Sequence, residues 1–127
     1  MPNMTRPASY ALALLHDIHP GPALHTYLGG IDATLAPHGG SFLIHGGTPR
    51  VVEGSLTCDL IVIGFPHADG AHHWYHSPAY QQLAELRRTF AQGAVVLYRG
   101  EDIDHRAFDI LTSNLDTSTA EDRGVVD

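Results

Sequence analysis

Four short apolar runs, separated by segments with helical spacing, restrict this chain to a few folds. The runs YALALLH, SFLIH, DLIVIGF and VVLYRG begin at residues 10, 41, 59 and 95 and have the length and the apolar or β-branched content of strands. One helical segment lies between the first two runs, and another lies between the last two. The order β-α-β-β-α-β is that of the ferredoxin-like arrangement, an α+β fold with a four-stranded antiparallel sheet that carries its helices on one face.

The first helix is predicted from the spacing of its apolar residues. They recur at intervals of four, three and four, at Leu24, Leu28, Ile31 and Leu35, so they share one helical face. The glycine pair at 39–40 is expected to end this helix.

The dipeptide Ser77-Pro78 divides the second helical segment. A residue before proline is pushed out of helical geometry, serine is a favoured N-cap, and proline suits the first helical turn. We therefore predict two helices with a break near residues 76–77. In the second helix the spacing predicts a core stripe and a neighbouring stripe: Ala79, Leu83, Leu86 and Phe90 in the first, and Tyr80, Ala84 and Arg87 in the second.

The 127 residues suffice for one compact domain. We expect residues 9–100 to form the ferredoxin-like domain and 1–8 a flexible N-terminal arm. Residues 101–127 are expected to be an acidic C-terminal extension with one extra helix, at 104–115, and a disordered end. Helices would cover only one face of the sheet, so we expect a second copy of the chain to cover the other face in a homodimer.

Charge and composition narrow the possible partners. The net charge is −7 and is uneven: the first 100 residues hold six acids against five arginines, and the last 27 hold eight acids against two. Because no basic stripe is present, nucleic acid is not expected as a partner. No stretch has the length of a membrane span and the N-terminus lacks an apolar signal core, so we expect a cytoplasmic protein with no membrane partner.

A cluster of histidines raises the question of a metal site. His72 and His76 stand four residues apart, which is the spacing of many zinc ligands on one helix, and His73 lies beside them. The predicted helix break allows the two rings to diverge, and no glutamate stands between them as in a zinc hydrolase. The prediction is therefore no metal and no other cofactor, with a His-ligated metal as the alternative.

Several short motifs, in one order and spacing, carry a resemblance to a known family. The sequence resembles the family called domain of unknown function 1330 over roughly residues 10–100. The motifs are His38-Gly39-Gly40, Gly46-Gly47, Glu53-Gly54, Phe65-Pro66, Trp74-Tyr75, Ser77-Pro78-Ala79-Tyr80 and Arg87.

The resemblance implies a ferredoxin-like domain that pairs into a dimeric α/β barrel, but it implies no reaction. Related dimeric barrels include cofactor-free monooxygenases, lactone isomerases, polyketide cyclases and haem-degrading enzymes, and this analogy concerns the fold only. The chain departs from the family where His45 and Cys58-Asp59 replace arginines. Imidazole, unlike guanidinium, can move a proton near neutral pH, so the first replacement favours acid–base chemistry.

The predicted catalytic residues are His45, Arg87, Tyr80 and His16. His16 and His45 end the first two strands and would flank a bound molecule if both face the barrel interior. Tyr80 would donate a hydrogen bond to a carbonyl or enolate oxygen, and Arg87 would offset negative charge there. The predicted substrate-binding residues are Ser77, Trp74, Glu53 and Tyr27, with a cap as the alternative role for Ser77 and packing for Trp74.

These expectations combine into one predicted function and two alternatives. The prediction is a cofactor-independent enzyme of isomerase or cyclase type that performs acid–base chemistry on an apolar, oxygenated small molecule, in biosynthesis of a secondary metabolite. One alternative is a non-catalytic metabolite-binding or accessory protein, because no catalytic signature is present. The other is a His-ligated metal protein.

Overall fold

The computed structural model describes residues 6–111, and in it the elements follow the predicted order. The strands are antiparallel neighbours in the order β2-β3-β1-β4, so the predicted α+β ferredoxin-like sheet is confirmed. Their bounds are β1 Ser9–His16, β2 Ser41–Ile44, β3 Asp59–Phe65 and β4 Gln92–Arg99. The α-helices are α1 Pro22–Leu35, α2 Gly70–Tyr75 and α3 Pro78–Arg87, and the short 3-10 helices are η1 Ala36–His38 and η2 Ala107–Asp109.

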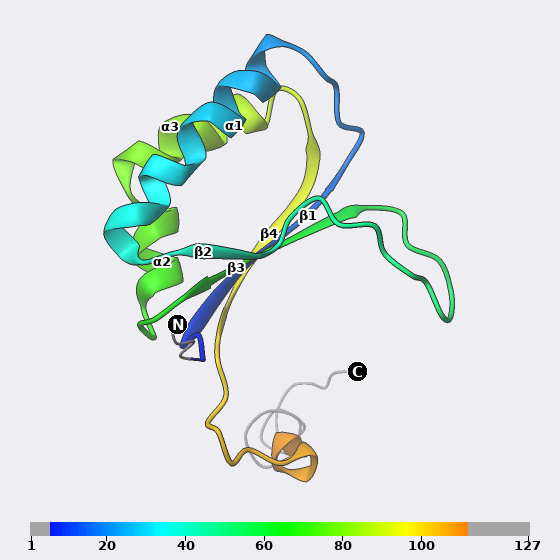
Figure 1. Ribbon diagram of the computed structural model, residues 1–127, viewed down its shortest axis with the longest axis vertical. Helices are drawn as coiled ribbons and strands as arrows, with labels where there is room; N and C mark the ends of the chain where they lie inside the picture. Colours follow the sequence, from blue (N-terminus) through cyan, green and yellow to red (C-terminus); the bar gives the residue numbers. More distant parts are fainter. Residues whose placement is uncertain (1–5, 112–127) are drawn as a thin grey trace, which may run out of the picture.

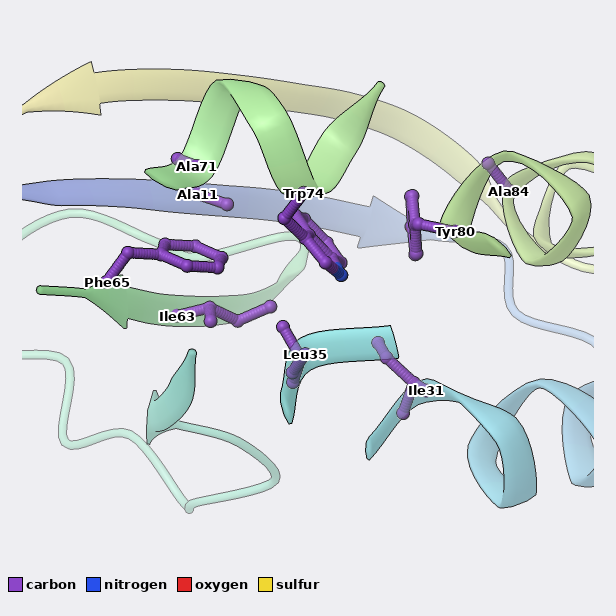
Figure 2. Packing of buried hydrophobic residues seen from close by; sticks show 9 residues of the cluster. All are labelled: Ala11, Ile31, Leu35, Ile63, Phe65, Ala71, Trp74, Tyr80 and Ala84. Atoms are coloured by element: carbon purple, nitrogen blue, oxygen red, sulfur yellow. The ribbon is translucent and has the colours of Figure 1, made fainter. Parts of the chain in front are cut away.

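All three α-helices lie on one face of the sheet (Figure 1). Alternation along β1 and β3 directs Ala11, Ile63 and Phe65 toward the helices, where they are buried. Figure 2 shows these side chains meeting Trp74 from α2 and Ile31 and Leu35 from the end of α1. This contact between sheet and helices is the main apolar core of the described residues.

The predicted break at Ser77-Pro78 is confirmed. Ser77 has extended backbone geometry, and its hydroxyl accepts a hydrogen bond from the Tyr80 amide at 3.2 Å while donating to the Trp74 carbonyl at 2.8 Å. The hydroxyl thus joins the end of α2 to the start of α3. It also fixes the direction in which the first turn of α3 points its side chains.

The predicted core stripe of α3 is wrong in part. Ala79 is exposed and Leu83 is half-buried, whereas the neighbouring stripe of Tyr80, Ala84 and Arg87 is fully buried. The reason is the packing of α3 on α1. Leu83 lies against Gly30 of α1, where an added Cβ would approach it to 3.3 Å, and this contact rotates the neighbouring stripe toward the sheet.

Several boundaries also differ from those predicted. β2 ends one residue before His45, and β4 begins at Gln92, three residues earlier than expected, because an apolar run does not mark the first, exposed residues of an edge strand. In the C-terminal extension, the described residues contain only η2, which stands apart from the sheet and helices in Figure 1. The rest of the helix predicted at 104–115 lies outside the described residues.

The opposite face of the sheet has no cover within the described chain. We call it the open face; its centre is apolar and consists of Tyr10, Leu12, Val62, Val96 and Tyr98. The segment between β2 and β3, residues 45–58, projects well beyond the sheet (Figure 1) and exposes Val52 almost completely. No helix among residues 6–111 is long and apolar enough to cross a membrane.

Candidate functional site

A cavity of about 310 Å³ lies between the helix-covered face of the sheet and the helices. Its walls are predominantly apolar and come from β1, β3, α1 and the turn after α3; they include Ala11, Leu15, Leu24, Ile31, Ile61 and Phe90. This volume is near the lower limit for ligand pockets in proteins. The cavity therefore suits a small molecule with a largely apolar body, and it lies within one chain rather than between two sheets.

Two tyrosine hydroxyls meet at the wall of this cavity. Tyr27 of α1 and Tyr80 of α3 both line it, and their hydroxyl oxygens are 2.8 Å apart, so one donates a hydrogen bond to the other. Burial raises the pKa of Tyr27 well above its ordinary value, and the neighbouring Tyr80 raises it further, whereas Arg87 acts in the opposite direction. Tyr27 is therefore protonated at neutral pH and able to donate a hydrogen bond.

Arg87 approaches this tyrosine pair from α3, two turns beyond Tyr80. Only 5% of its surface is exposed, and its positive charge and a side-chain hydrogen bond lower the pKa of Tyr27. The Nε atom of Arg87 is buried and has no hydrogen-bond partner among the described residues. Tyr80 lines the cavity as expected, whereas Arg87 lies outside the cavity lining and acts on it through Tyr27.

Trp74 forms part of the cavity wall and is held in a fixed orientation. Its indole Nε1 donates a hydrogen bond to the Thr34 hydroxyl at 3.0 Å, and that hydroxyl donates to the Ile31 carbonyl at 2.7 Å. The ring lies against Tyr80, with the ring centres 4.1 Å apart, and Figure 2 shows both side chains between the sheet and α1. Because its N–H is already used, Trp74 offers a bound molecule an aromatic surface rather than a donor.

His45 lies at the mouth of the cavity. It follows β2 directly, is exposed, and stacks on Phe42 with ring centres 4.3 Å apart. Simple alternation would place these two rings on opposite faces of the sheet, but the pairing of β2 with β3 shifts register between Phe42 and Ile44. This irregularity turns His45 to the helix-covered side, where Asp59 also lines the cavity.

His16 and Glu53 lie away from the cavity. Alternation along β1 places His16 on the open face, because its neighbour Leu15 points toward the helices. The His16 Nδ1 atom is 2.9 Å from an Asp17 oxygen, and Asp17 has a left-handed backbone (φ 52°). Glu53 is exposed in the segment between β2 and β3 and does not line the cavity. The two catalytic histidines expected to flank one ligand are therefore separated by the sheet.

The histidines of α2 lie on the surface. Because α2 continues through Tyr75 and His76 is its C-cap, the rings of His72 and His76 stay close, with centres 4.3 Å apart and planes tilted by 38°. The Nδ1 atom of His76 lies 3.0 Å from the His72 carbonyl oxygen. Within residues 6–111 no three His, Cys, Asp or Glu side chains are grouped closely enough to hold a metal ion.

Two residues of the site were absent from the sequence-based predictions. Thr34 orients the indole of Trp74, and Asp59 lines the same cavity as His45. A threonine between the apolar Ile31 and Leu35 of α1 is a weak sign of a buried hydrogen bond. Asp59 gives no such sign, because a polar residue at the start of a strand is common.

Comparison with known proteins identifies a family and a fold. The family described as "Domain of unknown function (DUF1330)" matches residues 8–101. A crystal structure of the RPA0582 protein from Rhodopseudomonas palustris, described as of unknown function, superposes with a TM-score of 0.55 at 14% identity, covering 77% of this chain and 85% of that one. A crystal structure of the methylated RPA0582 protein gives the same TM-score at 12% identity, covering 80% and 86%.

A lower similarity is found to SnoaB from Streptomyces nogalater, described as a cofactor-independent oxygenase. Its TM-score is 0.49 at 10% identity, covering 78% of this chain and 99% of that one. The comparison with curated proteins gives no match. At these identities, the two RPA0582 structures support the fold alone.

Proposed function

This chain belongs to the DUF1330 family, a domain of unknown function, and on that premise we propose that it is an enzyme that transforms a small, apolar, oxygenated molecule by proton transfer without a redox cofactor. The observation that carries the proposal is the Tyr27–Tyr80 hydroxyl pair in the wall of an otherwise apolar cavity. Polar groups that converge on an apolar pocket fix the orientation of a ligand.

The proposed chemistry is an isomerisation or cyclisation through an enolate. The substrate carbonyl would accept a hydrogen bond from Tyr80, and Arg87, which lies outside the cavity lining, would act through Tyr27 to stabilise the negative charge that develops on that oxygen. His45, at the cavity mouth, would take a proton from the carbon next to the carbonyl and return it at another position of the same molecule. In a cyclisation, the enolate carbon would instead form a bond to a second carbonyl carbon of the same molecule, whose C=O π bond breaks and whose oxygen receives the proton from His45. Bonds and protons balance in both cases without an external oxidant or reductant.

A second candidate function is binding without reaction, as a metabolite carrier or accessory protein. It is supported by the exposure of His45, which among residues 6–111 is the only histidine in the cavity lining and stands at its mouth rather than deep inside. In that case the same cavity would hold the ligand, and the tyrosine pair would orient it.

We also propose that two copies pair through the open face as a homodimer. The support is physical: an apolar, β-rich surface around Leu12, Val62 and Val96 is costly to leave in water. The projecting segment 45–58 exposes further apolar side chains, among them Val52 at 87%. Because this segment begins at His45, pairing would also fix the position of the cavity mouth.

The experiment that separates enzyme from binder uses bicyclic ketones, such as 2-tetralone, in deuterated buffer. We expect the protein to accelerate exchange of the protons next to the carbonyl, followed by NMR, and we expect His45→Ala and Tyr80→Phe each to lower that rate about a hundredfold. The matched control is His25→Ala, an exposed histidine on α1 outside the cavity. Tight binding of the ketone with no accelerated exchange would favour the carrier and exclude the proposed enzyme for this class of compound.

A further inference from the structure

Within residues 6–111, Arg87 is a buried cation that no buried anion accompanies. Only 5% of its surface is exposed, and its Nε atom has no hydrogen-bond partner in this part of the chain. The ion pairs found within residues 6–111 join other side chains: His16 with Asp17, Arg99 with Asp69, and His105 with Glu101 and Asp109. The neighbouring arginine, Arg88, is exposed and needs no such partner.

A charge in this position is energetically costly unless something compensates it. Removing a guanidinium from water costs several kcal/mol, and a chain normally recovers this cost with a carboxylate and a full set of hydrogen bonds. Arg87 has the Tyr27 hydroxyl beside it, which supplies a dipole but no charge. The described part of the chain therefore leaves the compensation incomplete.

An ionised tyrosine does not supply the missing charge. Burial raises the pKa of Tyr27, and this exceeds the opposing effect of Arg87, so the phenol keeps its proton at neutral pH. The Tyr27–Tyr80 hydrogen bond also requires a proton between the two oxygens. The hydroxyl pair is therefore neutral, and the positive charge of Arg87 polarises it, which makes it a stronger hydrogen-bond donor at the cavity wall.

From this arrangement we infer that the resident ligand of the cavity is an acid bound in its ionised form, with an apolar body against the sheet and one anionic oxygen that accepts the one hydrogen bond that the Tyr27–Tyr80 hydroxyl pair has left to donate. The inference rests on the proposed function, because it takes the same cavity as the ligand site. It further specifies that the substrate is an anion. A carboxylate and an acidic phenol or enol share this chemistry. Arg87 is then a positioning residue, which acts through Tyr27.

The test compares probes of matched shape and different charge. We expect 2-naphthoate to bind the wild-type protein about tenfold more tightly than the neutral 2-naphthamide, measured by calorimetry, because hydrogen bonds to a charged group are stronger than those to a neutral one. Arg87→Met should abolish this preference while leaving the affinity for 2-naphthamide within about twofold of wild type. Arg88→Met, next to it and exposed, should keep the preference.

A second experiment distinguishes a carboxylate ligand from an acidic phenol or enol. A chromogenic nitrophenol, added at the pH where half of it is ionised in free solution, reports its charge by absorbance. Binding to the wild-type protein should increase the phenolate band if the site accepts an acidic phenol or enol, and Arg87→Met should remove that increase. Preference for naphthoate without any change in the phenolate band would assign the site to carboxylates.

Failure of this inference can be distinguished from failure of the proposed function. Equal binding of naphthoate and naphthamide to the wild type overturns the inference but leaves the cavity as a ligand site. Binding of neither probe overturns both. Without ligand, Arg87→Met should raise the melting temperature, because it removes an uncompensated buried charge. A sharp fall in melting temperature would show that Arg87 has an internal structural partner and would overturn the inference.

Discussion

The described part of the chain buries one face of its sheet much more fully than the other. On the helix-covered face, Ala11, Ile63 and Phe65 are fully buried against the helices, and the cavity lies there. On the open face, one residue away along the same strands, Leu12 and Val62 are only half-buried although they are equally apolar.

Apolar content alone therefore does not distinguish a sheet face that forms a core from one that forms an interface. β1 and β3 are apolar on both faces, which is the pattern of strands that are covered on both sides. The helices of one chain can cover only one of these faces. The proposed ligand site therefore lies on the face that the chain covers, and the proposed dimer contact lies on the open face.

The largest expected difference between the faces comes from removing one large aromatic side chain from each. Trp74→Ala should lower the free energy of unfolding by about 3–5 kcal/mol, because it leaves a void in the covered core and removes the hydrogen bond that the Thr34 hydroxyl accepts from the indole. Tyr98→Ala, at a side chain that is 60% exposed on the open face, should cost less than about 1 kcal/mol in the monomer.

Urea unfolding at several protein concentrations measures both effects. If Tyr98 is covered by a partner, the cost of Tyr98→Ala should grow with protein concentration, whereas the cost of Trp74→Ala should not. Equal, concentration-independent costs would contradict the distinction between the two faces.

A charge on the open face should test association directly. Tyr98→Asp would bury a carboxylate against an apolar partner surface, so we expect the dimer to weaken by about a hundredfold, or roughly 3 kcal/mol. Light scattering after size exclusion should then report a monomer at micromolar concentration. Gln82→Asp, on the exposed side of α3, is the matched control and should remain a dimer. A wild-type protein that is monomeric at high concentration would contradict the pairing itself.

The smallest expected effect concerns the covered face at alkaline pH. The pKa of Tyr27 is raised by burial above its ordinary value of 10.0, so the unfolded chain loses this proton at lower pH than the folded chain does. Below the ordinary pKa of 10.0 the protonated phenol makes its full contribution to the free energy of unfolding. As pH rises above 10.0 this contribution falls, by at most about 1.4 kcal/mol per pH unit. Unfolding free energies between about pH 8 and about pH 11 should show this fall, and Tyr27→Phe should flatten it. An unchanged slope in Tyr27→Phe would place the phenol in contact with water.

Much of the fold could be predicted because its signals are local. The Ser77-Pro78 break follows from backbone sterics and a cap, and both act within a few residues, so it was found where expected. The strands of the sheet were found for the same reason, apart from the exposed start of β4.

The candidate site was predicted less completely. Of the predicted site residues, four line the cavity and four do not: Tyr80, Tyr27, Trp74 and His45 do, whereas His16, Glu53, Ser77 and Arg87 do not. The error at His16 came from assuming that the two histidines at strand ends share one interior. A register shift in β2, which depends on its pairing with β3, turned His45 to the covered side and left His16 on the open face.

The sequence by itself determined the order of the elements, the break between α2 and α3, and the apolar character of both sheet faces, because each depends on neighbouring residues in the chain. Only the tertiary structure decided which face holds the cavity, which stripe of α3 is buried, and that Arg87 is enclosed beside Tyr27 with no carboxylate partner from the described residues. These outcomes depend on how α1 and α3 pack on each other and on the sheet. Such packing joins residues far apart in the chain, and no local spacing specifies it.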